Sequence, residues 1–319
     1  MGFLPNWLYP DPQYLILALC ISVVTDVMYP KHLGILYLIH PVHTSYFLAL
    51  KLSKYGSSRP YGVIIWLIVV TVHIIPYSLL LYISWRISPM LWVLASSYII
   101  KVSISPALLL KILIDCIRYG VEGNYSRIRA LIQEIVRRDL SEVDLGHVYS
   151  AGIESLFENI VDAVTSPLLL LSFIGPIGAL LQRIVNTLDG ALGYKVGKFK
   201  YLGWFSALMD TIINYISARL VAILTIITSS IIQGSMKEKL LTYIKYRCRT
   251  DSVNAGHPMS AIAASLRVKL EKIGHYVLGE GELPKLKHVS LATELAVYVI
   301  IESYLIALLI ILFLHAISY

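Results

Sequence analysis

The sequence predicts an all-α, polytopic integral membrane protein with about four to six membrane-embedded helices and polar helical loops. Of its 319 residues, 57% are hydrophobic and only 15% are charged, whereas a soluble domain has roughly 25% charged residues. The mean hydropathy of +0.70 agrees with this class. Since we find no internal repeat, we expect one membrane-embedded domain over residues 1–319, with its motifs concentrated between residues 135 and 256.

The first third of the chain contains three apolar runs that are candidates to enter a bilayer. These predicted spans are Tyr14–Met28, Tyr61–Ser84 and Leu91–Leu113. Lys101 lies within the third span, where it either snorkels to the surface or faces the protein interior. Because residues 1–13 lack Lys and Arg, three spans place the polar segment Asp115–Glu158 on the cytoplasmic side. We therefore expect a multi-pass protein of the cell membrane whose site-forming loops face the cytoplasm.

The second half contains three further apolar segments, and they leave two arrangements open. The segments are Asp162–Arg183, Trp204–Ile232 and Leu291–Ala316, and Gln233–Ser290 between the last two is predicted as a polar loop with ten Lys or Arg residues. Pro167 and Gly175 are among the residues that break the first segment. If the first two segments both cross, residues 185–203 lie outside; if neither crosses fully, all polar loops share one side. We favour the second arrangement, because broken helices at membrane depth line protein cavities and the motif-bearing loops can then meet.

The charge and cysteine content exclude other classes of protein. The net charge of +7 is typical of basic cytoplasmic loops in a membrane protein. Basic runs interleaved with aromatic residues are absent from the sequence, so we expect no nucleic-acid partner. The three cysteines are widely separated, which argues against a disulfide framework or a zinc site.

Three carboxylates form the most informative pattern. Glu154, Glu158 and Asp162 are spaced i, i+4, i+8, which places them on one helix face within roughly 80°. Such a column repels itself unless a cation neutralises it, and a hydrated Mg²⁺ suits a few carboxylates combined with phosphate oxygens. The alternative is a solvated acidic face. Asn159 beside the column and the apolar run from Pro167 favour a site.

A second group of polar residues follows. Asn186 and Asp189 are three residues apart and can share a helix face. The glycines after them permit close approach of the backbone to a ligand, and Lys195 can bind phosphate as a point charge. The alternative is a loop with interfacial lysines. The stretch Gly193–Lys198 is one residue too short for a Walker A loop and lacks its Ser or Thr, so we do not predict a P-loop.

The long apolar segment after residue 204 contains Asp210, Asn214 and Arg219. Asp210 and Asn214 lie one turn apart, either as a structural polar pair or as part of a site. Arg219 is about 180° from Asp210 on an ideal helix, so it reaches the same pocket only if the helix bends. In the polar loop, residues 251–256 with Asn254 can form a helix N-cap with a turn or a loop that contacts a ligand.

Taken together, these segments resemble one family, the adenosylcobinamide-phosphate synthases of cobalamin biosynthesis. The matching pieces occur in the family's order and cover nearly the whole chain. They are His40-Pro41-Val42, Arg138-Asp139, Glu154-Ser155 with Glu158-Asn159 and Asp162, Val185-Asn186-Thr187-Leu188-Asp189, Gly193-Tyr194-Lys195, Ser206-Ala207 with Met209-Asp210 and Asn214, Ala218-Arg219, and Ser252 with Asn254-Ala255-Gly256.

The resemblance implies a carbon–nitrogen ligase that uses ATP and Mg²⁺. It would join a carboxylate of adenosylcobyric acid, a corrinoid, to aminopropanol or its O-phosphate. The residues expected to act in catalysis are Glu154, Glu158, Asp162, Asp189 and Asp210, of which the first three are also the hypothetical Mg²⁺ ligands. Those expected to bind substrate or phosphate are Asn159, Arg183, Asn186, Lys195, Asn214, Arg219 and Asn254.

Two other functions stay open on the sequence. A broken helix with intramembrane Asp210, Asn214 and Arg219 also occurs in secondary transporters, and the chain could instead anchor a corrinoid-assembly complex in the membrane. The lipid bilayer is an expected partner in every case, and a homo-oligomer is left open.

Overall fold

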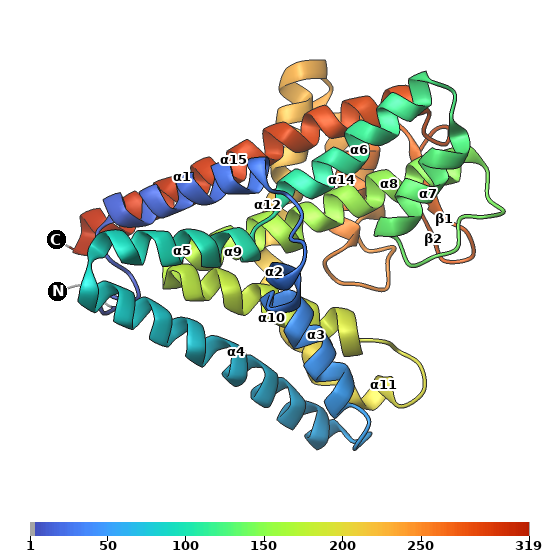
Figure 1. Ribbon diagram of the computed structural model, residues 1–319. Helices are drawn as coiled ribbons and strands as arrows, with labels where there is room; N and C mark the ends of the chain where they lie inside the picture. Colours follow the sequence, from blue (N-terminus) through green and yellow to red (C-terminus); the bar gives the residue numbers. More distant parts are fainter. Residues whose placement is uncertain (1–3, 319) are drawn as a thin grey trace. The chain divides into compact units, whose positions relative to one another are not determined.

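The computed structural model describes residues 4–318, which form an all-α membrane protein with a single short β-hairpin, as predicted (Figure 1). Four helical stretches are long and apolar enough to cross a membrane. They are Arg59–Ile87, Leu145–Ile174, Trp204–Gln233 and Leu286–Ile317. Pro12–Met28 and Pro89–Ser103 are shorter apolar helices. The fold class is therefore confirmed.

The described chain divides into two compact units. The first comprises the residues up to Ser105, Ser166–Ile213 and the chain from Tyr304 onward, and the second comprises Pro106–Thr165 and Asn214–Ser303. Helices α12 (Trp204–Gln233) and α15 (Leu286–Ser318) contribute residues to both units.

The first unit is a helical bundle built on α5 (Pro89–Ser103) and α10 (Pro176–Leu192). Helix α1 (Pro12–Met28) packs on α5, while α4 (Arg59–Ile87) packs on both α5 and α10. Helices α3 (Pro41–Leu52) and α9 (Ser166–Ile174) cover other sides of α10 (Figure 1). The short helix α2 (Ile35–Leu38) lies against α3, and the short helix α11 (Phe199–Leu202) lies against α4. This packing follows from nearly continuous apolar sequences, and it buries Trp92, Leu15 and Ile65 completely.

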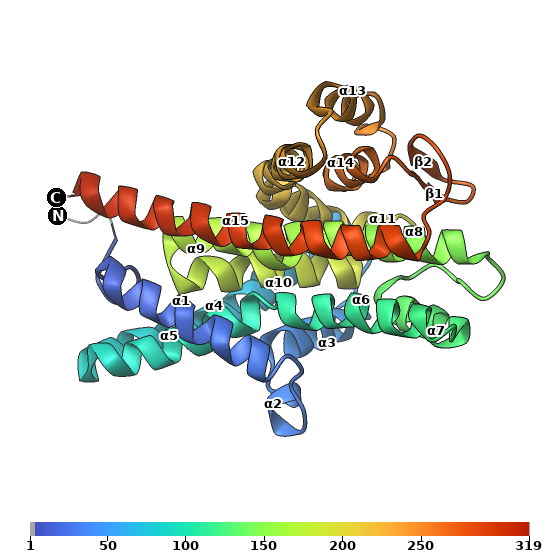
Figure 2. The ribbon, with the colours of Figure 1, turned by 90° about the horizontal axis from the view of Figure 1, so that it is seen from above.

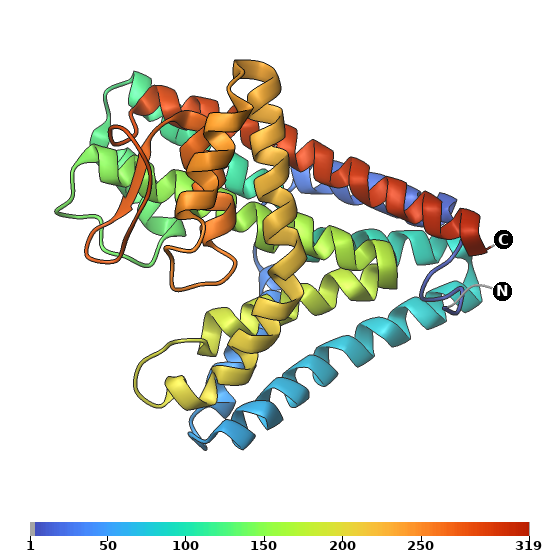
Figure 3. The ribbon, with the colours of Figure 1, turned by 180° about the vertical axis from the view of Figure 1, so that it is seen from behind.

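The second unit is organised around α8 (Leu145–Ile160). Helices α6 (Pro106–Val121) and α7 (Tyr125–Ile135) form a hairpin against it. Helix α14 (Gly256–Leu266) and the antiparallel strands β1 (Lys269–Lys272) and β2 (Tyr276–Gly279) also contact α8 or each other, and α13 (Met236–Tyr246) packs outside α14 (Figures 2 and 3). Leu270 pairs with Leu278, which turns both side chains toward the buried face of the hairpin.

One predicted span is wrong. The apolar run Leu91–Leu113 is not one helix, because α5 ends at Ser103 and α6 starts at Pro106. Proline has no backbone N–H and disfavours a helical residue before it. Ile104 is accordingly extended, with φ −124° and ψ 113°.

The predicted break at Pro167 is also misplaced. The chain stays helical from Leu145 to Ile174, with a π-helical turn, η1 (Val161–Thr165), just before the proline. The wider turn accommodates a residue that cannot donate a backbone hydrogen bond. The helix ends at Gly175, where a break was also predicted, and the φ of 76° at this residue favours glycine. Helix α10 then continues to Leu192, so Asn186 and Asp189 lie on a helix.

The segment Gln233–Ser290 is not a loop, as the sequence had suggested. It contains α13, α14 and the β-hairpin. The charged residues of this segment mask its short apolar periodicities, which the single-sequence pattern does not separate from a solvated loop.

Lys101 faces the interior of the first unit. Its Nζ lies 3.9 Å from Oδ1 of Asp26, and the two side chains are only 6% and 3% exposed. The hydroxyl of Ser105 also donates to Oδ1 of Asp26, over 2.8 Å. The ion pair therefore joins α1 to α5 in surroundings where either charge alone would be costly.

This pair generates a stability prediction. Replacing Lys101 with Met should destabilise the protein by about 3 kcal/mol or more, because Asp26 keeps its charge in a buried place. The double variant Lys101→Met with Asp26→Leu should recover most of the loss. Thermal unfolding in detergent, followed by tryptophan fluorescence, measures both effects.

The control is Lys111→Met, which removes an exposed pair with Asp115 in which Lys111 is 61% exposed. Such a pair is worth less than about 1 kcal/mol. Equal losses for the two single variants would contradict the buried role of Lys101.

Candidate functional site

The second unit contains a buried carboxylate with three partners. Glu154, on α8, is 4% exposed. Its Oε1 accepts a hydrogen bond of 2.6 Å from the Ser150 hydroxyl, and its Oε2 accepts one of 2.9 Å from the Tyr276 phenol. Arg138 places Nη2 3.1 Å from the same Oε2. Three separate parts of the unit therefore converge on one carboxylate: α8 itself, the connection before it and strand β2.

Tyr276 is held in its protonated form. Burial raises the pKa of its phenol above the ordinary value of 10.0, and the negative charge of Glu154 raises it further. At neutral pH the phenol is thus a donor to Glu154 and not a second anion.

The surroundings of Glu154 bear on the predicted metal ligands. Both of its oxygens already accept protein donors, and among residues 4–318 no three His, Cys, Asp or Glu side chains gather in a way that could hold a metal ion. The Mg²⁺ site at Glu154, Glu158 and Asp162 stays a prediction, since Mg²⁺ takes one or two carboxylates together with phosphate oxygens and water. Glu158 is exposed and Asp162 is half-buried, whereas Glu154 is buried.

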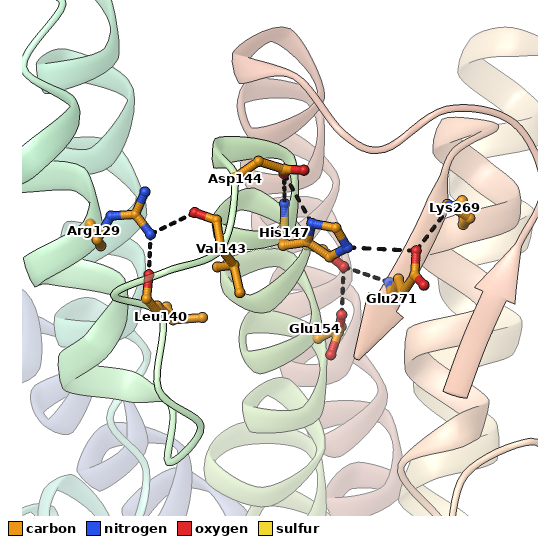
Figure 4. Close-up of polar contacts among 9 residues, drawn as sticks. Arg129, Leu140, Val143, Asp144, His147, Glu154, Lys269 and Glu271 are labelled. Carbon is orange, nitrogen blue, oxygen red and sulfur yellow. Dashed lines mark hydrogen bonds and ion pairs between the residues drawn. The ribbon is translucent and has the colours of Figure 1, made fainter. Parts of the chain in front are cut away.

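A chain of polar contacts joins the hairpin to the N-terminal part of α8 (Figure 4). The backbone N–H of Glu271, on β1, donates to the Ser150 hydroxyl over 2.8 Å. The His147 ring lies with Nδ1 3.0 Å from Oδ1 of Asp144 and Nε2 3.6 Å from Oε2 of Glu271. Asp144 caps α8, and the backbone N–H of His147 holds the pKa of that carboxyl below its ordinary value. These contacts fix the hairpin, and with it Tyr276, against α8.

The predicted residues Asp162 and Asn214 meet. Asp162 lies in the π-helical turn η1, and its Oδ1 accepts a hydrogen bond of 3.2 Å from Nδ2 of Asn214 on α12. Asn214 is 1% exposed. Asn159, in contrast, donates from Nδ2 back to the carbonyl of Ser155, over 2.8 Å. A π-helical turn that carries a carboxylate is frequently functional, because it re-aims side chains within an otherwise regular helix.

Arg219 and Asn254 also meet. Nη1 of Arg219 donates to Oδ1 of Asn254 over 2.8 Å, and its guanidinium stacks 3.4 Å from the ring centre of Tyr215. The hydroxyl of Ser252 accepts from the backbone N–H of Asn254 and of Ala255. Residues 251–256 thus form the predicted turn before α14 and present Asn254 to an arginine, whereas the N-cap is Ala255, without a side-chain cap, and contact with a ligand stays a prediction.

His257, the next residue after that turn, is a neutral group. Its Nδ1 lies 2.6 Å from the Tyr243 hydroxyl. Burial, together with the positive charges of Arg219 and Arg247, lowers its pKa from 6.5 to about 4. Tyr243 and His257 were not singled out from the sequence.

The first unit brings together another predicted pair. Nδ2 of Asn186, on α10, donates to Oδ1 of Asp210, on α12, over 3.2 Å. Asp189 lies one turn further along α10, and its backbone carbonyl accepts from the N–H of Gly193 over 2.7 Å. Lys195 is exposed in the loop that follows. This unit therefore holds its own group of carboxylate and amide side chains.

Arg183 lies on α10 one turn before these residues, and its charge acts on His40. The His40 ring caps α3, since its Nδ1 accepts the backbone N–H of Val42 over 3.2 Å. Burial lowers the pKa of His40 to about 3, with further contributions from His32 and Arg183. The His-Pro-Val motif, uninformative by its sequence, thus provides a neutral histidine close to a cation.

Sequence reasoning missed the partners of Glu154. Arg138 stood out only as part of a family motif, and nothing in the sequence links Tyr276 to a carboxylate 122 residues away. The alternation of apolar and polar residues around Tyr276 could have indicated a strand.

The fold and these paired groups define a class of protein: a polytopic helical membrane protein whose apolar helices carry paired carboxylates and amides. Comparison with known proteins specifies it further. The family described as CobD/Cbib protein matches residues 19–300. The chain belongs to this family.

Two named relatives align with most of the chain. A protein of Aeropyrum pernix named "Probable cobalamin biosynthesis protein CobD" is 43% identical over 279 residues, which is 88% of this chain and 87% of the relative. A protein of the same name from Thermoplasma acidophilum is 34% identical over 303 residues, 92% of this chain and 95% of the relative. No solved structure matches the chain.

The Glu154 cluster predicts a large effect of a single substitution. Arg138→Met should destabilise the protein by about 3 kcal/mol or more, because it leaves a buried carboxylate without its cation. Tyr276→Phe should cost about 1–3 kcal/mol, since it removes one hydrogen bond to a charged group. Thermal unfolding of the purified variants provides the measurement.

Lys285→Met serves as the matched control, because Lys285 pairs with Glu282 at the surface with exposures of 65% and 80%. We expect a change below about 1 kcal/mol there. A similarly small change for Arg138→Met would show that Glu154 does not depend on this cation.

The lowered pKa of His257 predicts that the stability of the protein depends on pH. Its folded pKa of about 4 lies below the ordinary value of 6.5, so the unfolded chain takes up a proton first as the pH falls. The contribution of His257 is complete above pH 6.5 and is lost progressively down to about pH 4. His257→Gln should therefore lose less stability than the wild type over this window. Parallel melting curves between these two pH values check the difference, and identical slopes would contradict it.

Proposed function

We propose that this protein acts in cobalamin biosynthesis as an ATP-dependent carbon–nitrogen ligase. It would join a carboxylate of adenosylcobyric acid to (R)-1-amino-2-propanol O-phosphate and give adenosylcobinamide phosphate. Membership of the CobD/Cbib family over residues 19–300 and the names of the relatives support the pathway. The reaction itself rests on the resemblance of the motifs and on the chemistry of the residues they contain.

One observation carries the proposal most directly: residues of different motifs are paired in space. Asp162 bonds to Asn214 and Arg219 to Asn254 in the second unit, and Asn186 bonds to Asp210 in the first. Packing alone favours apolar side chains at such places, since a buried polar group costs free energy unless it is hydrogen-bonded. Amide and carboxylate groups kept in pairs within apolar helices mark a functional region more often than a structural one.

The proposed ligation has clear chemical requirements. A carboxylate is a poor electrophile, so it is most simply activated as an acyl phosphate by transfer of a phosphoryl group from ATP. The amine nitrogen then attacks the acyl carbon, a C–N bond forms, the bond from carbon to the phosphate oxygen breaks, and the amine loses a proton. A side-chain base and groups that neutralise the phosphates are needed for these steps.

We assign a role to each residue from the groups that surround it. Glu158 and Asp162 fit a Mg²⁺–nucleotide complex, since Mg²⁺ takes one or two carboxylates with phosphate oxygens and water. Bound there, Mg²⁺ would neutralise developing phosphate charge. Glu154 does not fit this role, because Arg138, Ser150 and Tyr276 already occupy its oxygens. We assign it instead to positioning Arg138 and Tyr276.

Further proposed roles concern the first unit and the cations. Asp189 and Asp210 are candidates for the base that accepts the amine proton, and Asn186 orients Asp210 through its hydrogen bond. Arg183, Lys195 and Arg219 are candidates to hold the phosphates and the anionic corrinoid. Asn159, Asn214 and Asn254 are proposed to bind substrate or phosphate, and Asn214 and Asn254 lie beside Asp162 and Arg219 respectively.

The test of the proposal is product formation by the purified full chain in lipid nanodiscs. Adenosylcobyric acid, ATP and Mg²⁺ are supplied with either aminopropanol or its O-phosphate, and the amide product is measured by mass spectrometry. We expect product only when ATP is present, and a faster reaction with the phosphorylated amine. Folded protein that forms no amide with either amine would overturn the proposal.

Substitution of Asp162 gives the sharpest prediction within this assay. Asp162→Asn keeps a hydrogen-bonding side chain near Asn214 but removes the charge, so kcat should fall by about 100-fold or more. Glu142→Gln, at an exposed position before α8, should leave the rate unchanged. A fully active Asp162→Asn variant would exclude Asp162 from the chemistry.

A transporter is the second candidate. The helix break at Gly175, followed by the polar pair of Asn186 and Asp210, is also typical of the binding regions of secondary transporters. Uptake of adenosylcobyric acid into proteoliposomes without formation of an amide would favour this function over the ligase.

A further inference from the structure

A cavity of about 550 Å³ lies outside the candidate site, in the second unit. It is formed by α13, α14 and the turn after β2, and it shares no lining residue with the groups described above. Three cations and two carboxylates line it: Lys239, Lys245, Arg267, Glu238 and Glu280. The lining therefore has a net positive charge.

Lys239 is the unusual member of this lining. It is 2% exposed, and its Nζ donates to the backbone carbonyl of Ser229 over 2.7 Å. That is the one partner of the ammonium group within residues 4–318, although an ammonium carries three donors. Burial lowers the pKa of Lys239, and the charge of Arg267 lowers it further. An under-satisfied buried cation is costly unless an anion compensates it.

The two carboxylates of the lining do not serve Lys239. Glu238 pairs with Arg267 over 3.2 Å, with both side chains more than 60% exposed. Glu280 pairs with Lys245 over 2.6 Å, again at the surface. Surface pairs of this kind are weak and exchange readily. The positive charge of Lys239 thus remains uncompensated inside the cavity wall.

The backbone is strained at the same place. Within residues 4–318, Ser235 and Arg267 are the two non-glycine residues with positive φ, at 64° and 54°. They contact each other, since Nη2 of Arg267 donates to the Ser235 hydroxyl over 2.9 Å. Side chains rarely adopt this conformation, and where they do the surrounding structure usually holds them for a function. Arg267 is the C-cap of α14, and it lines the cavity together with Lys239.

We propose that this cavity binds a phosphate group, held by Lys239 and Arg267 with Lys245 at its rim. The phosphate could belong to a phospholipid headgroup or to a soluble phosphorylated compound. An exposed apolar lining residue suits acyl chains: Leu241, on α13, lines the cavity and is 59% exposed. Helix α12 is itself long and apolar enough to span a membrane and ends at Gln233, two residues before Ser235.

The test compares Lys239→Met with Lys237→Met in the purified full chain. Lys237 is exposed on the same helix and does not line the cavity, so its substitution removes one positive charge without touching the site. In the lipid arm, retention of phosphatidylglycerol and of phosphatidylcholine with the same acyl chains is measured by native mass spectrometry. In the soluble arm, thermal unfolding is followed in phosphatidylcholine nanodiscs with inorganic phosphate or with chloride at equal ionic strength.

We expect the wild type and Lys237→Met to prefer one of the two probes, phosphatidylglycerol or inorganic phosphate, over its control, phosphatidylcholine or chloride. Phosphatidylglycerol is retained over phosphatidylcholine if the source is lipid, and phosphate raises Tm over chloride if the source is soluble. Lys239→Met should bind the effective probe about tenfold more weakly, since it lacks one charge-assisted hydrogen bond.

A further readout separates a ligand site from a structural lysine. Without the probe, Lys239→Met should unfold at the same temperature as the wild type or a higher one, because it removes a buried charge that the protein does not satisfy. A large fall in Tm for this variant would assign Lys239 a structural role and overturn the proposal. So would the absence of any preference for phosphatidylglycerol and for phosphate in the wild type.

Discussion

The compensation of one buried charge, that of Glu154, holds the second unit together. Removing a carboxylate from water is costly, and a protein can do so only if donors and a cation replace the water. Ser150 supplies a donor from the same helix, Arg138 a cation from the connection before α8, and Tyr276 a phenol from strand β2. The hairpin and the α7–α8 connection therefore cannot move away from α8 without leaving the charge uncompensated.

The same constraint explains how polar residues exist within apolar helices of this protein. Asp162 with Asn214, and Asn186 with Asp210, are each hydrogen-bonded across neighbouring helices of their own unit. The π-helical turn before Pro167 contributes to this arrangement, because it changes the direction of the Asp162 side chain from that in a regular helix. The wider turn also accommodates Pro167, which has no backbone N–H to donate to the preceding turn. Histidines near cations, His40 and His257, stay neutral for the related reason that burial disfavours a further positive charge.

The candidate site and the cavity near α13 differ in how their charges are satisfied. Around Glu154 both carboxylate oxygens face protein donors from three segments, which suits a region that must be rigid to position reacting groups. Lys239 has a single carbonyl partner, and the adjacent backbone at Ser235 and Arg267 is strained. A cavity that lacks its counter-charge in the protein alone is complementary to an anion from outside.

The sequence by itself determined the class of fold and much of the residue set. Hydropathy predicted the long apolar helices Arg59–Ile87, Trp204–Gln233 and Leu286–Ile317 but not Leu145–Ile174. The motifs named residues such as Asp162, Asn214, Arg219 and Asn254, which the structure brings into pairs. These features could be predicted because they depend on composition and on spacing within one helix. The break at Gly175 was predicted correctly, but the helix end at Ser103 was missed and no break occurs at Pro167, since a proline either ends a helix or is tolerated according to the turn before it.

Only the tertiary structure decided which side chains compensate which charges. Glu154 appeared from its spacing to be one of three equivalent metal ligands, whereas Tyr276, 122 residues away, and Arg138 surround it. Nor could the sequence distinguish Lys239 from Lys237, although one is buried and the other exposed. Burial and long-range contact arise when distant segments pack together, and the free energy of a charged group depends on those surroundings more than on its neighbours in the chain.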